Sequence, residues 1–185
     1  MIKSLEIEGL LLIEPRRFGD ERGVFSEVFK ASALAEAGFH KTFIQDNLAR
    51  SPQKGTLRGL HMQREPYAQD KLVRASRGAI FDVAVDLRPG SKTFGQSFSV
   101  VLSDDNWLQL LVPAGFAHGY CTLVDDCEVS YKVSAPYAAD HEDGLLWSDP
   151  ALAIPWPVAA GEVIVNARDA AWPTLGEWRQ RREAR

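Results

Sequence analysis

The chain has 185 residues, of which 45% are hydrophobic and 25% charged, and its formal net charge is −4. These values are typical of a globular protein that is long enough to bury a core without disulfide or metal crosslinks. A net acidic charge is not typical of a nucleic-acid-binding protein, and the only basic cluster, RQRREAR, lies at the C-terminus. We expect residues 176–185 to form a peripheral helix or tail.

The N-terminal segment is apolar but is interrupted by Glu6 and Glu8. Its longest apolar run is far shorter than the ~20 residues that a membrane helix needs, and it lacks the layout of a signal peptide. We therefore expect a cytoplasmic protein without a membrane segment. The pattern predicts one strand over residues 4–13, and a helix over residues 30–39 that Ser32 caps and Gly38 ends.

Alternation of polar and apolar residues dominates the middle of the chain and is typical of strands. Strands are predicted at residues 42–50, 56–62, 71–77, 79–88, 95–103, 107–113, 118–124 and 127–134. Short strands separated by Gly, Pro, Asp or Ser turns predict an all-β sandwich or barrel, and this strand count favours a jelly roll with a few short helices. After about residue 135 the alternation weakens, but no linker composition appears, so we expect a single domain over residues 1–185.

The two cysteines, Cys121 and Cys127, lie in the run CTLVDDC, which is not a CxxC motif. They could face each other across a hairpin, so a disulfide stays open. Buried reduced thiols are the alternative, and they agree better with a cytosolic protein.

His61 lies in the middle of a predicted strand, three residues after Arg58. In a regular strand, positions three apart face opposite sides of the sheet. Gly59 stands between them, and a glycine inside a strand often marks a bulge. A bulge there would direct both Arg58 and His61 into one cavity; without it, Arg58 would face solvent.

Lys71 and Tyr131 also lie on strand faces that are otherwise apolar. Lys71 shares a face with Val73 and Ala75, so its side chain either extends past the mouth of the barrel or points into a pocket. Tyr131 belongs to an apolar stripe and is expected to point inward, either as core packing or as a proton donor in a cavity.

The run PAGFAH, which ends at His118, is similar to one half of the metal signature of cupin proteins. The other half would need a His-x-His pair with a nearby carboxylate, and the matching strand offers only His61 and Gln63. We expect no metal site. The remaining histidines, His40 and His141, are expected on the surface.

Several runs together resemble one family: FGDERGVFSEVF, FIQDNLARS, GTLRGLHMQ, AQDKLVR, QLLVPAGFAHGY, EVSYKVSAPYA and ARDAAWPTL. Over about residues 5–175 the chain resembles the dTDP-4-dehydrorhamnose 3,5-epimerases, sugar-nucleotide epimerases with a cupin-like jelly roll. The resemblance implies epimerisation of dTDP-4-dehydro-6-deoxy-D-glucose at C3 and C5 without a cofactor. It also implies a homodimer in which the N-terminal region of one subunit helps to form the other subunit's site.

The resemblance implies site residues as well. His61 matches the general base, Asp169 its carboxylate partner, Tyr131 the proton donor, and Lys71 the lysine near the substrate ketone. The positions that match substrate contacts are Arg22, Glu27, Gln45, Asn47, Arg58, His118, Glu142 and Arg168. Among them the arginines suit the diphosphate, because a guanidinium binds phosphate oxygens in a bidentate manner.

The sequence departs from the family pattern at three positions, where Met62 replaces a common aromatic residue, Asp70 a glycine and Asn166 a serine. None of these changes removes a catalytic group, but they leave open the exact sugar and whether both carbons invert. The alternatives are an epimerase that acts on C3 or C5 only, a metal-dependent cupin oxygenase or isomerase, and a sugar-nucleotide binding module without catalysis.

Overall fold

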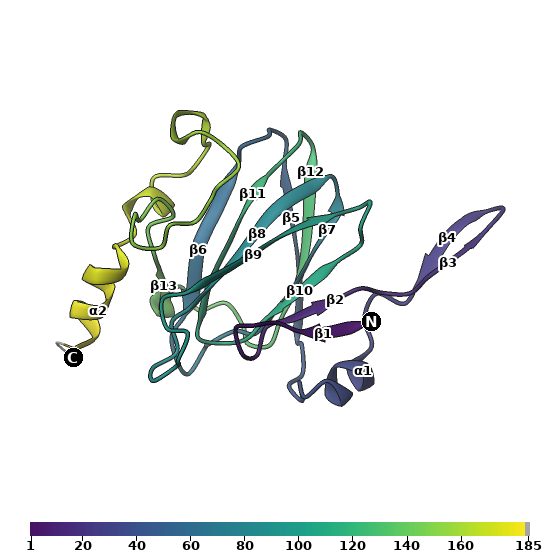
Figure 1. The fold of residues 1–185 in the computed structure, drawn as a ribbon, viewed down its shortest axis with the longest axis horizontal. Coiled ribbons are helices and arrows are strands. Elements are labelled where there is room, and N and C mark those ends of the chain that lie inside the picture. The colour runs from purple at the N-terminus through teal and green to yellow at the C-terminus, as the bar shows by residue number, and fades with distance from the viewer. Residues whose placement is uncertain (184–185) are drawn as a thin grey trace.

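Two antiparallel sheets pack face to face in the computed structural model, which describes residues 1–183 (Figure 1). The six-stranded sheet has the order β1-β2-β10-β7-β12-β5, and the five-stranded sheet has the order β13-β6-β11-β8-β9. The strands of the first sheet are β1 Ile2–Ser4, β2 Leu11–Ile13, β10 Gln109–Val112, β7 Lys71–Arg77, β12 Cys127–Val133 and β5 Gln45–Ser51. Those of the second are β13 Glu142–Gly144, β6 Leu57–Gln63, β11 Phe116–Thr122, β8 Ala79–Asp86 and β9 Ser97–Ser103. This arrangement confirms the predicted all-β jelly roll.

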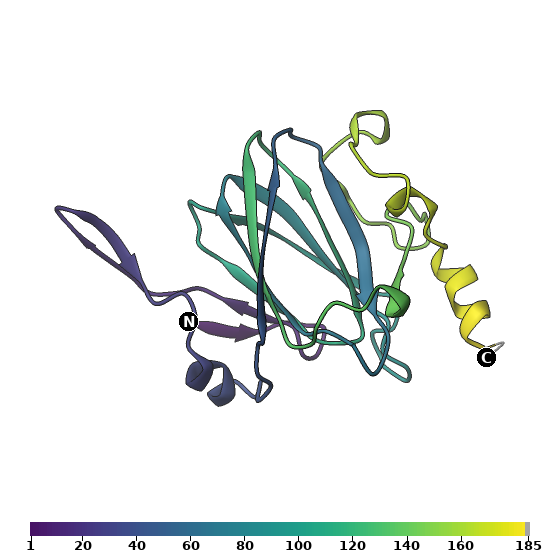
Figure 2. The same ribbon diagram turned by 180° about the vertical axis from the view of Figure 1, so that it is seen from behind.

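The predicted alternation along β8 explains how the five-stranded sheet is buried on both faces. Ile80 and Ala84 face the core between the two sheets. Val83 and Val85 face the opposite side, where a second apolar cluster includes Trp178 of helix α2, Leu175–Glu183. The chain after β13 therefore covers the outer face of this sheet, and it runs beside β6 in Figure 2. Residues 176–183 of the segment expected as a peripheral helix or tail belong to α2, and the last two residues of that segment lie outside the described residues.

Two predictions near the N-terminus were wrong in detail. Residues 4–13 do not form one strand, because Gly9 adopts a φ of 93° in the turn of a hairpin between β1 and β2. Helix α1, Ala31–Glu36, begins before Ser32, and Lys30 at its N-cap makes no side-chain capping bond. Gly38 follows the helix with a φ of 92°, a conformation that suits glycine, so the predicted end is confirmed.

A second hairpin, formed by β3 Arg17–Asp20 and β4 Gly23–Ser26, extends away from the two sheets (Figures 1 and 2). Its side chains include the exposed hydrophobic residues Phe18, Val24 and Phe25. Three short 3-10 helices, Ala139–His141, Ala160–Glu162 and Asp169–Ala171, complete the described elements. Within residues 1–183, no helix has the length and apolar character needed to cross a membrane.

Both cysteines are free and buried, so the structure resolves the open question of a disulfide in favour of reduced thiols. Burial raises the pKa of Cys121 to about 11, and the nearby Cys127 acts in the same direction.

Candidate active site

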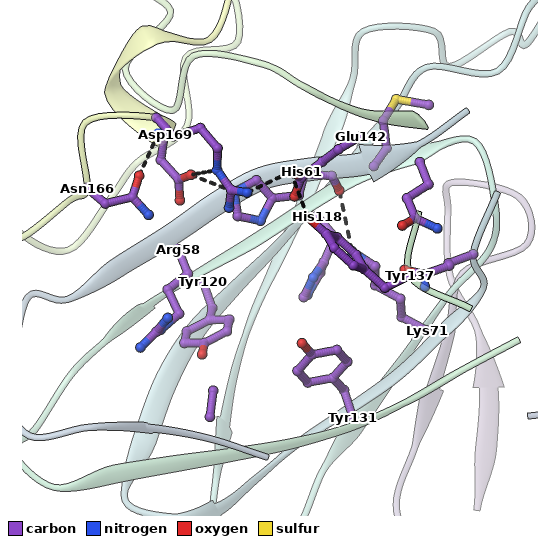
Figure 3. Close-up of a pocket in the computed structure, with 15 residues that line it drawn as sticks. Arg58, His61, Lys71, His118, Tyr120, Tyr131, Tyr137, Glu142, Asn166 and Asp169 are labelled. Atoms are coloured by element: carbon purple, nitrogen blue, oxygen red, sulfur yellow. Dashed lines mark hydrogen bonds and ion pairs between the residues drawn. The ribbon is translucent and has the colours of Figure 1, made fainter. Parts of the chain in front are cut away.

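A cavity of about 320 Å³ opens between the two sheets, and side chains of both sheets line it (Figure 3). From the six-stranded sheet come Ala49, Lys71 and Tyr131; from the five-stranded sheet come Arg58, His61, Met62, Gln63, His118, Tyr120 and Glu142. Gln69, Tyr137, Asn166, Arg168 and Asp169 complete the lining from the intervening segments. The cavity therefore holds eight of the twelve positions that the family resemblance implies as catalytic or substrate-contacting residues.

A bulge in β6 brings Arg58 and His61 into this cavity together. On β11, His118 pairs with His61 and Tyr120 pairs with Arg58, so three steps along β6 lie opposite two steps along β11. Gly59, at the bulge, has a φ of 137°, and a Cβ there would lie 2.5 Å from the Cα of Gly119. The close strand approach thus requires glycine, and the predicted bulge is confirmed.

His61 is held by a buried carboxylate. Its Nε2 lies 2.8 Å from Oδ1 of Asp169, whose other oxygen, Oδ2, accepts a hydrogen bond from the Gly59 amide at 3.0 Å. The side-chain oxygen of Asn166 accepts the Asp169 amide at 2.7 Å, which fixes the start of this turn. Burial alone would raise the pKa of Asp169, but the hydrogen bonds from His61 and Gly59 outweigh it and keep the pKa below its ordinary value.

An ionised Asp169 decides which nitrogen of His61 can act as a base. A carboxylate accepts a hydrogen bond, so in the neutral imidazole the proton lies on Nε2. The lone pair is then on Nδ1, the ring nitrogen that Asp169 does not engage.

Tyr131 enters the cavity from the opposite sheet. It lies on β12, whereas His61 lies on β6, and Figure 3 shows the Tyr131 hydroxyl directed into the space between them. Burial raises the pKa of Tyr131, and the charge of Arg58 partly offsets this effect. The phenol is therefore protonated at neutral pH and is able to donate a proton.

Lys71, the first residue of β7, points into the cavity, which decides between the two orientations left open by the sequence. Its Nζ donates a hydrogen bond to the carbonyl oxygen of His61 at 3.4 Å. Burial lowers the pKa of Lys71 to about 8, although the charges of Asp82 and Glu142 act against the shift. At neutral pH most of the molecules therefore carry an ammonium group here.

His118 forms a second histidine–carboxylate pair at the base of the cavity. Its Nε2 lies 2.9 Å from Oδ2 and 3.1 Å from Oδ1 of Asp82, and both residues are buried. Asp82 was not predicted as a site residue. The signal was present in β8, where the alternation puts Asp82 between Ile80 and Ala84 on the face that is turned to the core.

Residues 4–177 match a family model described as dTDP-4-dehydrorhamnose 3,5-epimerase. The chain belongs to the dTDP-4-dehydrorhamnose 3,5-epimerase family. It is 52% identical over 175 residues to an enzyme of that name from Sinorhizobium fredii, a match that covers 95% of this chain and 89% of the relative. The membership confirms the resemblance inferred from the sequence.

Solved structures agree with the family and with its cupin-like fold. A dTDP-6-deoxy-D-glucose-3,5-epimerase from Legionella pneumophila, in complex with dTDP-4-keto-L-rhamnose, is 44% identical with a TM-score of 0.90, and the match covers 95% of this chain and 93% of that one. A 3'-monoepimerase from Streptomyces bikiniensis, in complex with dTDP-quinovose, is 32% identical with a TM-score of 0.83 over 98% of this chain and 97% of that one.

At the mouth of the cavity, this member of the epimerase family has a chain of polar contacts. Glu142 Oε2 accepts a hydrogen bond from Arg168 at 2.6 Å and from the Tyr137 hydroxyl at 3.3 Å. The Nε of Arg168 also lies 3.3 Å from Oδ1 of Asp169. The network thus connects the mouth of the cavity with the carboxylate that holds His61.

Four of the residues expected to contact the substrate lie outside the cavity of this chain. Arg22 is at the turn of the β3–β4 hairpin, where its 86% exposed side chain pairs with Asp20. Glu27 is exposed and lines a separate apolar pocket beside α1. Gln45 and Asn47 lie on β5, an edge strand of the six-stranded sheet, and bond to each other at 2.8 Å.

Tyr120 and Tyr137 line the cavity but were not predicted as site residues. Tyr120 follows His118 by two residues on the same strand, so period-two alternation could have placed both on one face. Tyr137 lies in a segment without regular alternation, which gave no comparable signal. Within residues 1–183, no three His, Cys, Asp or Glu side chains are grouped so that they could hold a metal ion.

Proposed function

We propose that the chain catalyses the epimerisation of dTDP-4-dehydro-6-deoxy-D-glucose at C3 and C5, which gives dTDP-4-dehydro-L-rhamnose. The observation that carries the proposal is the placement of His61 and Tyr131, which enter one cavity from opposite sheets. Inversion of a carbon acid requires a base on one face of the sugar ring and an acid on the other.

The reaction begins with the substrate ketone, because the C4 carbonyl acidifies the hydrogens on C3 and C5. His61 removes one of these protons with Nδ1, and the electron pair of the broken C–H bond moves to O4 as an enolate. The ammonium group of Lys71 stabilises this oxyanion, and the low dielectric of a closed site strengthens the interaction.

Tyr131 then returns a proton to the same carbon from the opposite face, and the electron pair of its O–H bond stays on the phenolate oxygen. The enolate electrons form the new C–H bond and restore the ketone. Asp169 keeps His61 in the active tautomer and stabilises the imidazolium. Before a second cycle, the imidazolium gives its proton to solvent and the phenolate takes one from solvent, which restores both groups. The second cycle then inverts the other carbon, and no redox cofactor is required because the substrate already carries its ketone.

We assign four further cavity residues to substrate binding. Arg58 and Arg168 suit the diphosphate of the substrate. His118 and Glu142 contact its sugar ring. These assignments, with the four catalytic ones, extend to this chain the roles that the family resemblance implies.

We further propose that the protein is cytoplasmic, which agrees with its two free, buried cysteines. We also propose a homodimer, because four expected binding residues lie outside the cavity of their own chain. The β3–β4 hairpin exposes three large hydrophobic side chains next to Arg22, which supports its burial against a partner. A partner's hairpin would supply Arg22 and Glu27 to the cavity, and Gln45 and Asn47 on the β5 edge would lie beside it. Sedimentation equilibrium tests the dimer.

The alternative is an epimerase that inverts only one carbon, since such an enzyme would share the base and the cavity. The family relation to a 3'-monoepimerase keeps this alternative open to experiment, but that relative is 32% identical, against 52% and 44% for the two 3,5-epimerases. The higher identity favours inversion of both carbons.

Proton NMR of the substrate, incubated with the protein in deuterium oxide, tests the proposal. We expect deuterium at both C3 and C5, loss of exchange at both in His61→Ala, and exchange without normal inversion in Tyr131→Phe. Deuterium at one carbon would support the alternative. Absence of exchange in the unaltered protein would contradict both.

A further inference from the structure

Tyr120 has a buried hydroxyl group that the mechanism above does not use. Its side chain lines the cavity and the residue is 5% exposed. Among residues 1–183, its Oη has no hydrogen-bond partner. A buried O–H without a partner costs about 1–3 kcal/mol, so a protein that keeps one in a reaction cavity holds a donor ready for a group that appears later.

The polar groups around Tyr120 narrow the choice of that group. Asp82 from β8 already accepts His118 with both oxygens, and the Cys127 thiol from β12 is directed to the carbonyl oxygens of Ala79 and Val124. Of the ionisable groups that act on the pKa of Tyr120, two remain: the guanidinium of Arg58 on β6, which is itself a donor, and the hydroxyl of Tyr131 on β12.

Arg58, Tyr120 and Tyr131 form one electrostatic group. Arg58 pairs with Tyr120 in the register of β6 and β11, and its charge lowers the pKa of both tyrosines against the larger opposing effect of burial. The proximity of Tyr131 in turn raises the pKa of Tyr120. Tyr120 therefore stays protonated, and Figure 3 shows its hydroxyl directed toward the opposite sheet, which carries Tyr131.

We propose that Tyr120 is a positioning residue that donates a hydrogen bond to the phenolate of Tyr131 when Tyr131 has given up its proton. The proposal rests on the role of Tyr131 as the acid under the proposed function. Tyr120 would supply a donor to a negative charge that exists only during the reaction, in the presence of the positive charge of Arg58. Such bonds are often longer in the free enzyme and shorten when the charge develops, which agrees with a Tyr120 hydroxyl that has no partner among the described residues.

The first test is a titration that does not depend on activity. Tyrosinate absorbance is followed against pH in the unaltered protein, Tyr120→Phe, Tyr131→Phe and the double variant. The difference between proteins with and without Tyr131 gives its pKa in each background. Loss of the Tyr120 donor should raise that pKa by about one pH unit or more, because a hydrogen bond to a charged group is lost. An equal pKa in both backgrounds would overturn the proposal.

The second test is kinetic, with the keto-sugar nucleotide as substrate and Tyr67→Phe as the matched control. Tyr67 contacts the ring of His141 outside the cavity, so its loss of a hydroxyl should leave turnover unchanged. In Tyr120→Phe we expect kcat to fall about tenfold or more with KM unchanged. A raised KM with an unchanged kcat would mean that Tyr120 binds the substrate instead, which would also overturn the proposal.

Stability provides a third readout that separates a structural role from the proposed one. Phenylalanine removes no hydrogen bond of the free protein, so the melting temperature of Tyr120→Phe should be equal or higher. A clear fall would assign the hydroxyl to the fold. If the unaltered protein failed to convert the substrate, the proposed function would fail, and the titration would still decide whether Tyr120 stabilises the Tyr131 phenolate.

Discussion

Replacement of Asp169 by asparagine should remove most of the activity although it keeps the shape of the side chain. The Gly59 amide, 3.0 Å from Oδ2, is a donor, so the amide oxygen of asparagine must face it. The NH2 group then faces Nε2 of His61, which lies 2.8 Å from the other oxygen. Nε2 becomes an acceptor, and the imidazole proton moves to Nδ1.

This tautomer cannot act as the base, because the nitrogen that faces the substrate no longer has a lone pair. A change of the same kind in a serine-protease triad lowers kcat by about 10⁴. We expect a fall on the order of 10³–10⁴ here, which corresponds to roughly 4–5.5 kcal/mol of transition-state stabilisation. KM should change little, because the altered group acts through His61.

The assay is exchange of the C3 and C5 hydrogens in deuterium oxide, followed by NMR for Asp169→Asn and for a matched control, Asp104→Asn. Asp104 also accepts one backbone amide, that of Gly78 at 2.8 Å, but it does not line the cavity. The control should exchange at the normal rate. If Asp169→Asn stayed within tenfold of the unaltered protein at both carbons, the orientation of His61 by Asp169 would not be what makes it a base.

Other substitutions and pH changes test separate parts of the structure. Activity should fall as pH rises through about 8, where Lys71 loses its proton, and Lys71→Arg should move this fall to higher pH in a pH–rate profile. Gly59→Ala should cost about 1–3 kcal/mol from the positive φ alone, and more from the contact with β11, measured by urea unfolding. Burial opposes ionisation of Asp86, but bonds from Arg88 and two hydroxyl groups hold its pKa below the ordinary value. Its contribution to stability should therefore be present above the unfolded pKa of ~3.9 and lost as pH falls through the folded value, and Asp86→Ala should cost about 3–5 kcal/mol at pH 7. The Cys121 thiol should resist alkylation at neutral pH until the protein is unfolded, as mass spectrometry would show.

The strands could be predicted from the sequence because alternation is a direct consequence of burial on one face of a sheet. It placed Val73 and Ala75 on the core face of β7, and even the bulge at Gly59 was predictable from a glycine inside a strand. The hairpin at residues 4–13 was missed because the alternation that ends at Glu8 is followed directly after Gly9 by the apolar run of residues 10–13, so the pattern gave no clear break at the turn.

The site was less accessible to sequence reasoning because its contacts join residues that are far apart in the chain. Asp169 is 108 positions from His61, and no local pattern pairs the two; only the family resemblance did. Tyr120 looks like an ordinary core residue in an apolar strand, and its unbonded hydroxyl is visible only in three dimensions. Arg22 is exposed at the hairpin turn and far from the cavity of its own chain, which agrees with the proposed role in the cavity of a partner subunit.

The position of His61 and Tyr131 on opposite sheets has a thermodynamic consequence. In the proposed mechanism, every proton transfer between them and the sugar can run backwards through the same contacts, with the phenolate as the base and the imidazolium as the acid. The protein therefore shortens the time to equilibrium and leaves the ratio of the epimers to the free energies of the sugars themselves. Conversion beyond that ratio requires a separate reaction that consumes one of the epimers.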